Sequence, residues 1–408
     1  MKNYCRICKS VDLYEFLDLG FTPPADHFLK IDQLNKPEIY YPLKVLMCRT
    51  CGLAQLNYIV CPEELYRNDY PYESSMTNSG LRHWQEFAKT VCETYQVKSE
   101  DLVVDIGSNV GVLLESFKNQ GTNVLGVDPA SNIARIAEKR GIETWDKFFS
   151  FSVSEQIVSS KQRAKIITAT NVFAHIDDLH SFMSAINLLL AHKGVFIFEA
   201  PYFGNLIKHQ EYDTIYHEHL SYLLLEPILH LLKPYSMEVI DVQERDIHGG
   251  SFRVFISKKG EYNTHQRVHQ FLENEQKSLW RDEKKLFNFA DNVKKNRKDL
   301  IQLLNKLKLE GKKLAAVSAP AKGMTLLNYC GIGTETLEFV TEKSTLKKDR
   351  FCPGTHLKVV DDSELINKDI DYALLLAWNF SEEIMTNLSE YKSKGGKFII
   401  PIPHPKII

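Results

Sequence analysis

Short apolar runs alternate with amphipathic segments through the middle of the chain, a pattern that is typical of α/β proteins. The runs predict buried parallel strands, and the segments between them predict helices. The strands are expected at Leu102–Ile106, Asn123–Val127, Gly141–Thr144, Lys165–Ala169 and Gly194–Glu199. Two later runs, Met237–Asp246 and Ser251–Ser257, flank His248-Gly-Gly and predict an antiparallel hairpin. We therefore expect a mostly parallel sheet that a hairpin completes.

The two ends of the chain carry different patterns. Two strand-like runs, Leu13–Leu19 and Tyr41–Met47, lie in a first segment that is too short for a large core. A charged segment with an apolar stripe at helical spacing predicts a helical bridge, and the last hundred residues return to the α/β pattern. Their strands are expected at Lys313–Val317, Leu337–Val340, Tyr372–Ala377 and Lys397–Ile400. The predicted units are 1–70, 71–262, 263–310 and 311–408.

Composition limits the class of protein. A chain of 408 residues with 44% hydrophobic and 25% charged residues is typical of a soluble globular protein with two or three domains. The net charge of −2 gives no reason to expect nucleic acid or an anionic membrane as partner. No apolar run is long enough to span a bilayer, and the first residues lack the apolar core of a signal peptide. We expect a cytoplasmic monomer or weak dimer.

Eight cysteines include two Cys-x-x-Cys pairs, which predict a metal site. Without an export signal, such pairs are more typical of metal ligands than of disulfides. In Cys5-Arg-Ile-Cys8 and Cys48-Arg-Thr-Cys51, the two-residue spacing lets both thiolates face one tetrahedral ion. Four thiolates favour zinc and close its coordination shell, so the predicted site is structural. The alternative is two unrelated pairs of reduced cysteines.

The turn after the first strand of the middle unit has the glycines of a cofactor site. It reads Asp105-Ile-Gly107-Ser-Asn109-Val-Gly111, and the next strand ends in Asp128. Glycines in such a turn allow close approach of a ligand, and an acid after the next strand suits a ribose diol. This spacing fits the S-adenosylmethionine site of class I methyltransferases better than a nicotinamide site. The alternative is a purely structural turn.

Two further stretches concentrate polar groups beside predicted strands. The stretch Asp213-Thr-Ile-Tyr-His-Glu-His-Leu-Ser-Tyr222 is dense in proton-handling side chains, and His175 follows the strand Lys165–Ala169. Ligands of such sheets collect at the carboxyl ends of the strands, so both features are expected at one cleft. In the last unit, Ser318-Ala-Pro-Ala-Lys-Gly323 links a strand to a helix and is suited to a phosphate. A polar surface loop and an ordinary turn, respectively, are the alternatives.

An ordered set of motifs along the whole chain resembles the three-domain, S-adenosylmethionine-dependent C-methyltransferases that act on nucleotide-linked 4-keto-deoxysugars. Besides the two cysteine pairs, the glycine turn and the stretch 213–219, the set includes Tyr70-x-Tyr72-x-Ser-Ser, Asn171-Val-Phe-Ala-His175, Glu199-Ala-Pro-Tyr202, His248-Gly-Gly-Ser251, Ala321-Lys-Gly-x-Thr-Leu-Leu-Asn328, Pro353-Gly-Thr-His356, Ala377-Trp-Asn379 and Gly395-Gly-Lys-Phe-Ile-Ile-Pro401. The resemblance implies a zinc-binding module, a class I methyltransferase domain and a Rossmann-like C-terminal α/β domain.

The resemblance also assigns roles to residues. The four cysteines would hold structural zinc. S-adenosylmethionine would contact Asp105, Gly107, Asn109, Gly111, Asp128, Pro129, Asp146 and Asn171. His219 matches the family's general base, and the residues expected around the reacting sugar are Tyr216, Glu218, His175, Tyr70 and Tyr72. Further substrate contacts are expected at Tyr202, Tyr222, His248, Lys322, Asn328, Trp378 and Asn379, with Lys322 near the diphosphate of the sugar nucleotide.

The implied reaction is methylation of the carbon next to the ketone, in deoxysugar or surface-polysaccharide biosynthesis. A histidine of near-neutral pKa suits removal of the proton from that carbon. We expect Glu218 or a backbone carbonyl to fix the tautomer of His219, and Tyr216 or His175 to stabilise the enolate. An N- or O-methyltransferase acting on a sugar or small metabolite is an alternative.

The chain departs from the family pattern at three places. Val110 stands where the family commonly has aspartate, and this motivates a second alternative, a sugar-nucleotide-binding homologue without methyl transfer. Val317-Ser-Ala-Pro320 replaces a Tyr-Gly-Ala lead. An aspartate that is common after the next strand is replaced around Thr341-Glu342, and both changes suggest an altered nucleotide or substrate pocket.

Overall fold

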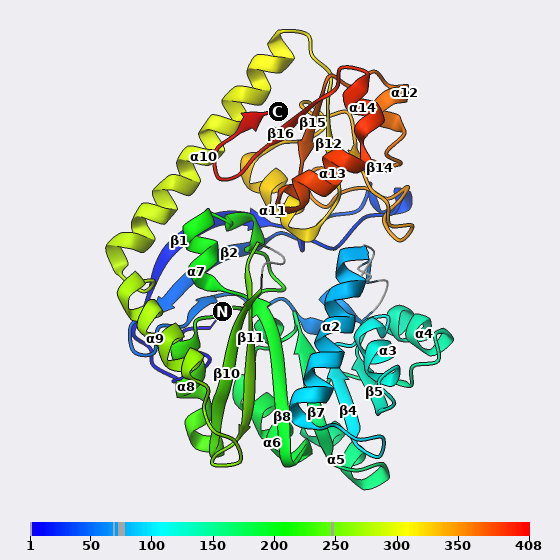
Figure 1. Cartoon of the computed structure of the whole chain (residues 1–408). Coiled ribbons are helices and arrows are strands. Elements are labelled where there is room, and N and C mark those ends of the chain that lie inside the picture. Colours follow the sequence, from blue (N-terminus) through cyan, green and yellow to red (C-terminus); the bar gives the residue numbers. More distant parts are fainter. Residues whose placement is uncertain (1, 68–69, 72–77, 246–248) are drawn as a thin grey trace.

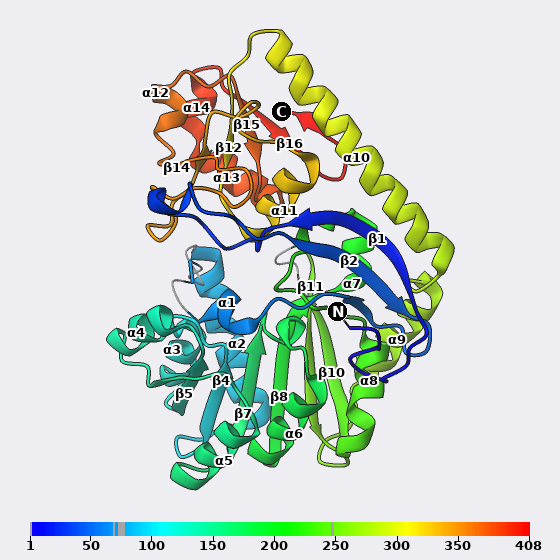
Figure 2. The same ribbon diagram turned by 180° about the vertical axis from the view of Figure 1, so that it is seen from behind.

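Three sheets with surrounding helices make up the computed structural model, which describes residues 2–67, 70–71, 78–245 and 249–408. Figure 1 shows the middle and C-terminal sheets at opposite ends of the molecule, with the N-terminal strands β1 (Leu13–Thr22) and β2 (Tyr41–Cys48) between them. The view from behind gives the same order (Figure 2). Tyr72 and His248, both predicted site residues, lie outside the described residues.

The middle sheet has seven strands in the order β10-β11-β8-β7-β4-β5-β6. All neighbours pair in parallel except around β11, which is antiparallel to both β10 and β8. The strands are β4 (Leu102–Ile106), β5 (Asn123–Asp128), β6 (Thr144–Asp146), β7 (Ala164–Thr170), β8 (Leu190–Pro201), β10 (Met237–Arg245) and β11 (Ser251–Lys258). The predicted sheet and its closing hairpin are confirmed.

Helices cover both faces of this sheet, which explains why its strands are continuous apolar runs. All five residues of β4 are buried. One face packs against α2 (Asn78–Tyr95), α3 (Val112–Lys118) and α4 (Ser131–Lys139). The other packs against α5 (Phe151–Ser160), α6 (Leu179–Leu189) and α8 (Leu225–Leu232). The predicted α/β fold class is confirmed.

Two predicted strands lie a few residues later in the chain than expected. The strand expected at Gly141–Thr144 is β6 (Thr144–Asp146), because Gly141 has a φ of 77° in the turn that closes α4. The strand expected at Leu337–Val340 is the two-residue β13 (Val340–Thr341). Leu337 is buried, but only Val340 and Thr341 pair with the neighbouring strand. The apolar residues before Val340 are therefore apolar because they are buried, and not because they pair in the sheet.

The N-terminal sheet receives its last strand from the middle of the chain. Its order is β1-β2-β3-β9, in which β3 spans Ala54–Leu56 and β9 spans Ser221–Tyr222. The predicted pairing of the first two strands is confirmed, and it places Leu13 opposite Cys48. The pairing of Ala54 with Tyr222 was not predicted. It ties the module directly to the stretch 213–222.

The C-terminal sheet has the order β14-β13-β12-β15-β16-β17, and only the β16–β17 pair is antiparallel. The strands not yet defined are β12 (Leu314–Val317), β14 (Val359–Val360), β15 (Tyr372–Leu375), β16 (Lys397–Ile400) and β17 (Lys406–Ile407). Its helices are α11 (Ala321–Cys330), α12 (Glu364–Asn367), α13 (Ser381–Asn387) and α14 (Ser389–Ser393). The unit is Rossmann-like, as predicted.

Two helices, α9 (Gln266–Ser278) and α10 (Glu283–Leu309), connect the middle and C-terminal units, and α10 runs along the side of the molecule (Figure 1). Asn296 is a buried polar residue in its apolar stripe. Its Nδ2 donates to the carbonyls of Pro401 and Pro403 at 2.8 Å, and its Oδ1 accepts from the Tyr212 hydroxyl at 2.8 Å. The long helix thus fastens both units. Within the described part of the chain, no helix has the length and apolar character needed to cross a membrane.

Candidate active site and metal centre

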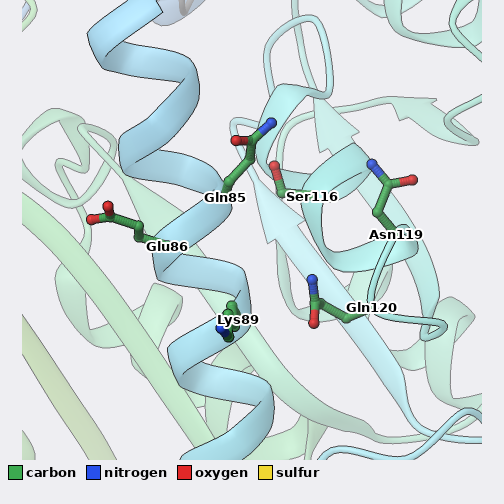
Figure 3. A pocket seen from close by; sticks show the side chains of 6 residues that line it. All are labelled: Gln85, Glu86, Lys89, Ser116, Asn119 and Gln120. Carbon is green, nitrogen blue, oxygen red and sulfur yellow. The ribbon is translucent and has the colours of Figure 1, made fainter.

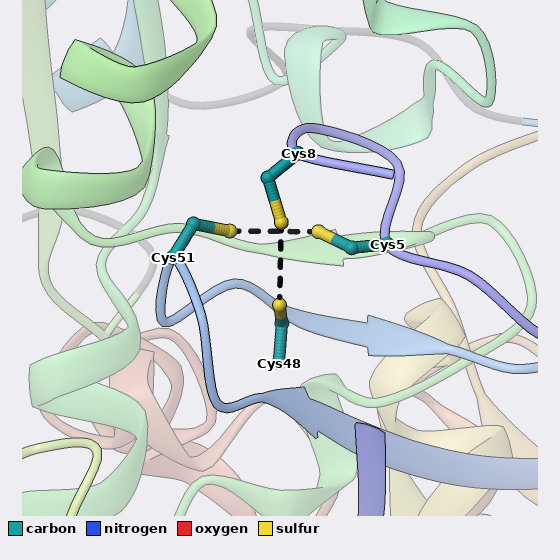
Figure 4. A group of neighbouring side chains, drawn as sticks. All are labelled: Cys5, Cys8, Cys48 and Cys51. Carbon is teal, nitrogen blue, oxygen red and sulfur yellow. Dashed lines mark hydrogen bonds between the residues drawn. The ribbon is translucent and has the colours of Figure 1, made fainter. Parts of the chain in front are cut away.

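The four predicted metal ligands meet at one point (Figure 4). Their Sγ atoms all lie within 4.8 Å of one another, and the pairs Cys5–Cys51 and Cys8–Cys48 are each 3.5 Å apart. A tetrahedral ion with zinc–sulfur bonds of about 2.3 Å holds its sulfurs roughly 3.8 Å apart, so the arrangement fits zinc. Four sulfur ligands leave no position for a substrate. The zinc is structural.

The glycine turn after β4 has the geometry of a cofactor cradle. Gly107 has a φ of 65°, and a Cβ there would lie 2.3 Å from Cγ2 of Val172, so no other residue fits. The backbone N–H of Asn109 donates to Oδ2 of Asp128 at 2.9 Å, which joins the turn to the end of β5. Gly111 also has a positive φ, of 78°. Glycines in the turn and an acid on the next strand are the groups that hold a ribose-bearing cofactor in such sheets.

Three other predicted cofactor residues lie at the same edge of the sheet. Asp146, at the end of β6, pairs with Arg67 at 3.0 Å, and Arg67 also donates to the carbonyl of Pro129 at 3.4 Å. Asn171 follows β7 with a φ of 56°, and its N–H donates to the carbonyl of Glu199. Arg67 comes from the end of the N-terminal module. No pattern in the sequence predicted that Arg67 would contact Pro129 and Asp146.

Burial changes the acid–base properties of the two aspartates under the turn. It raises the pKa of Asp128 to about 6, although N–H donors at Ala130 and Asn109 oppose the shift. It raises the pKa of Asp105 to about 7, against a hydrogen bond of 2.6 Å from the Thr168 hydroxyl. Val110 is buried in the apolar cluster with Leu114, so this departure from the family contributes to the core.

His219 is held in one tautomer. Its Nδ1 lies 2.8 Å from the carbonyl oxygen of Thr214, which can only accept, so Nδ1 carries the hydrogen. In the neutral ring Nε2 is then the acceptor, and the Tyr216 hydroxyl donates to it at 2.9 Å. Of the two tautomer-fixing groups predicted from the sequence, the backbone carbonyl has this role. Nε2 is the atom available for a proton.

His175 lies beside His219, as expected from their positions after strands. The two ring centroids are 5.1 Å apart, and Tyr66 stacks on the other side of His175 at 5.8 Å. Burial, and next the charge of His219, lower the pKa of His175 well below its ordinary value. Its Nε2 has no hydrogen-bond partner within the described residues, although it is buried. A neutral imidazole with an unused polar atom suits contact with a substrate.

Glu218 faces a different set of groups from His219. Its Oε2 accepts from the Tyr70 hydroxyl at 3.1 Å. Burial raises the pKa of Glu218 well above its ordinary value, and the charge of Asp26 adds to the shift. Asp26, from the N-terminal module, forms a buried ion pair of 3.2 Å with Lys347 of the C-terminal unit. All three domains therefore contribute to the surroundings of Glu218.

Lys322 lies against the stretch 213–219 and not in open solvent. Its Nζ is 3.9 Å from Oδ2 of Asp213 and lies over the Trp378 ring, 4.4 Å from the centroid. The indole Nε1 of Trp378 donates to the same carboxylate at 2.7 Å. Burial lowers the pKa of Lys322, while Asp213 and Glu211 oppose the shift. The predicted substrate residues Lys322 and Trp378 thus lie beside the stretch 213–219.

Other predicted substrate residues have their polar atoms turned into the protein. Asn328 donates from Nδ2 to the carbonyls of Met324 and Pro353. The Tyr202 ring packs against Phe252 and Phe271 and is 7% exposed. These contacts fix both side chains within the protein, and the role of both residues at the substrate stays a prediction.

Two predicted substrate residues and one neighbour have buried polar atoms without a partner in the described part of the chain: Tyr222, Ser221 and Asn379. Tyr222 and Ser221 line a cavity of about 10 Å³ beside His219, together with Thr214. That space is about enough for one water molecule. A larger hollow, of about 300 Å³, lies elsewhere, between α2 and α3 (Figure 3). It includes none of the predicted site residues and is lined by Gln85, Glu86, Lys89, Ser116, Asn119 and Gln120.

Comparison with protein families divides the chain into three matched parts. Residues 5–66 match a zinc binding domain family, and residues 83–242 match a methyltransferase domain family. Residues 246–403 match the C-methyltransferase C-terminal domain family. The C-methyltransferase NovU of Streptomyces niveus is 34% identical over 405 residues, which covers 99% of this chain and 96% of NovU.

The chain belongs to the three-domain, S-adenosylmethionine-dependent C-methyltransferases. It is an enzyme that transfers a methyl group to carbon, with S-adenosylmethionine as cofactor and structural zinc. The other relatives and structures described next match a smaller part of this chain. The ubiquinone biosynthesis O-methyltransferase of Rhodopseudomonas palustris is 25% identical over 23% of this chain and 38% of its own length. A methyltransferase structure from Clostridium acetobutylicum covers 44% of this chain and 92% of its own, at 16% identity and a TM-score of 0.36, too low to support an inference.

Proposed function

We propose that this C-methyltransferase acts on a nucleotide-diphosphate-linked 4-keto-deoxysugar, at the carbon next to the ketone. The observation that carries the proposal is the tautomer of His219. In it, Nε2 accepts a hydrogen bond from the hydroxyl of Tyr216, a partner that a substrate can displace. A carbon acid needs a base of near-neutral pKa and a hydrogen-bond donor for the enolate oxygen. His219 is proposed as the base and Tyr216 as the donor, and the two side chains share one hydrogen bond.

The residues divide the work of the first step. His219 Nε2 takes the proton from carbon, and the Thr214 carbonyl stabilises the charge that then forms on the ring. Tyr216, released from Nε2 when substrate enters, donates to the enolate oxygen. His175 is proposed as a second hydrogen-bond donor to the enolate oxygen. Its ring centroid lies 5.1 Å from that of His219, which places it close to the same group. When bound, S-adenosylmethionine would supply an electrophilic methyl group, and the turn after β4 would hold it.

The sugar nucleotide is proposed to lie between the middle and C-terminal units. Lys322, at the start of α11, and the backbone amides of that helix end suit a diphosphate. The close contact of Lys322 and Trp378 with Asp213 supports this position, since it places the helix end beside the catalytic stretch. Such a substrate belongs to deoxysugar or surface-polysaccharide biosynthesis.

The test follows solvent deuterium into the carbon next to the ketone, together with methyl transfer, using a panel of nucleotide-linked 4-keto sugars. We expect His219→Asn to lose at least about 100-fold in both rates, since a positioned base contributes about 10²–10⁴-fold. His269→Asn, on the exposed side of α9, is the matched control and should keep both rates.

Two results would count against the assignment. If His219→Asn kept both rates, another group would be the base. Methyl transfer without any deuterium uptake would favour an N- or O-methyltransferase, since such an acceptor is not a carbon acid. Products are identified by mass spectrometry with labelled S-adenosylmethionine.

A further inference from the structure

Asp146 ends the strand that lies next to the one carrying Asp128. The two aspartates are register partners, because β5 and β6 pair in parallel with Asp128 opposite Asp146. The N–H of Lys147 also donates to the carbonyl of Asp128 at 3.2 Å, which keeps the two strand ends together. An acid in the position of Asp128 suits the ribose of the cofactor. The base that the ribose carries is therefore expected one strand further, beside Asp146.

The chemistry of adenine suits a carboxylate in this position. The base carries an exocyclic 6-amino group, which donates hydrogen bonds, and an ionised carboxylate can only accept them. The side chain of Asp146 is 41% exposed, so burial does not fix its orientation. A carboxylate with this exposure needs a partner to hold it in one direction.

Arg67 is the partner that holds the Asp146 carboxylate. Its Nη1 lies 3.0 Å from Oδ1 of Asp146 and 3.4 Å from the carbonyl oxygen of Pro129, so it contacts the ends of both strands. The ion pair uses Oδ1, and the second oxygen of an ionised carboxylate keeps its acceptor capacity. Exposed ion pairs add little to stability, which makes a role at the cofactor rim the more informative explanation of this contact.

The backbone of Arg67 is fixed from two sides. Its N–H donates to the carbonyl of Glu63 at 3.3 Å, in the last turn of α1 (Pro62–Tyr66). Its carbonyl accepts from the N–H of Ser131, at the start of α4, at 3.4 Å. The N-terminal module thus places a guanidinium group on the cofactor rim from an anchored position.

We propose that Arg67 is a positioning residue for the cofactor, which orients the Asp146 carboxylate so that its second oxygen accepts a hydrogen bond from the 6-amino group of adenine. The cofactor site is then built from two domains, and the N-terminal module contributes Arg67 to it. The inference concerns S-adenosylmethionine alone and does not depend on which sugar is methylated.

The experiment measures the binding of two ligands by calorimetry, with the zinc-loaded full chain. The ligands are S-adenosylhomocysteine and the analogue in which hydrogen replaces the 6-amino group of the base. We expect the parent to bind S-adenosylhomocysteine at least about tenfold more tightly, because hydrogen bonds to a charged group are among the strong ones. This comparison needs no variant, and equal binding of the two ligands would overturn the inference.

Variants then assign the preference to the pair of Arg67 and Asp146. Arg67→Met and Asp146→Ala should each reduce the ratio between the two ligands to within about threefold. Because Arg67 acts through Asp146, adding Arg67→Met to Asp146→Ala should leave the ratio of the single variant unchanged. Arg140→Met is the matched control, since Arg140 forms an ion pair of similar exposure with Glu115 at the other end of α4, and it should keep the ratio of the parent.

A purely structural role of Arg67 predicts a different result. Arg67→Met would then weaken the binding of both ligands alike and keep the ratio of the parent, which would overturn the assignment to Arg67. The parent's ratio in Asp146→Ala would equally overturn it, because the amino group would then have another acceptor.

Discussion

Asp105 and His219 are both buried titratable residues, but they differ in how fully their polar atoms are paired in hydrogen bonds. Asp105 is 2% exposed and accepts one hydroxyl hydrogen bond, from Thr168, so burial dominates and the pKa rises to about 7. His219 is 8% exposed, but both of its ring nitrogens have partners, at Thr214 and Tyr216. The aspartate therefore opposes folding when it is ionised, whereas the imidazole of the histidine is fixed in orientation by its two hydrogen bonds.

Asp105→Asn should make the protein more stable at pH 8 and lose that advantage near pH 5. The pKa of Asp105 in the folded state is about 7, above its unfolded value, so the native state takes up a proton between pH 7 and 4 that the unfolded chain does not. The parent's stability consequently rises by up to about 1.4 kcal/mol per pH unit as the pH falls through that range. The variant lacks this term, and its gain at pH 8 should be on the order of 2–4 kcal/mol.

The measurement is urea denaturation at pH 5 and pH 8. Asp291→Asn, an exposed carboxylate on α10, is the control and should change little at either pH. A stability difference between Asp105→Asn and the parent that is the same at both pH values would show that the titration of Asp105 is not linked to folding.

The residues proposed for the site could be named from the sequence because their motifs are local. His219, Tyr216 and His175 stand at recognisable positions, and the structure places them together. Their partners were not found, because these are tertiary contacts. The Thr214 carbonyl and the stacked ring of Tyr66 leave no pattern in a sequence, since one is backbone and the other is one aromatic residue among many.

At the scale of elements, the zinc knuckle is docked on the loop that follows β7. Arg6, between the two cysteines of the first pair, is fully buried and lies 3.0 Å from Asp177 and 2.7 Å from the Leu56 carbonyl. The same knuckle offers the Ile7 carbonyl to Nε2 of His180 at 2.6 Å. Asp177 is two residues from His175. The four cysteines therefore hold a segment that packs against the loop carrying His175.

Removing the zinc should loosen the loop as well as the module. We expect Cys8→Ser, or treatment with a chelator, to lower methyl transfer by at least about tenfold and to speed hydrogen exchange of the amides between residues 171 and 180. Structural zinc sites contribute folding energy directly, which is the reason for the expected loss. Cys61→Ser, an exposed cysteine outside the cluster, is the control.

Hydrogen exchange read by mass spectrometry separates the two segments. Faster exchange confined to residues 5–66, with 171–180 unchanged, would contradict the coupling and leave the zinc a role within its own module.

Most strands and helices were predictable because burial and periodicity are local. The exceptions are elements that exist through a distant partner. Ser221–Tyr222 is a strand only because it pairs with β3, and a two-residue strand has no period to detect. In the same way β13 has two paired residues inside a longer apolar run.

On the scale of the whole molecule, the three domains meet at buried charges. Asp26 and Lys347 come from opposite ends of the chain, with side chains 7% and 6% exposed, and they pair at 3.2 Å. Lys347 also donates to the Ala319 carbonyl at 2.8 Å, in the turn after β12, while the N–H of Ala319 is held by Glu342. The charge of Asp26 acts in turn on Glu218 in the catalytic stretch. The sequence predicted the three units but not this junction, since neither charged residue belongs to a motif.

The junction makes a strong prediction about stability. Lys347→Met leaves the buried Asp26 carboxylate without its cation and next to Glu218, so it should cost about 3–5 kcal/mol, as broken buried pairs do. Lys348→Met removes the neighbouring lysine, whose pair with Asp361 is partly exposed, and should change the free energy of unfolding little. The double variant Asp26→Asn with Lys347→Met removes both charges. It should be more stable than Lys347→Met alone by at least about 1 kcal/mol, because no unpaired charge remains in the interior.

The measurement compares the midpoints of urea denaturation of the parent and the three variants. Equal losses for Lys347→Met and Lys348→Met would mean that water reaches the pair and that the three domains are joined by their apolar contacts.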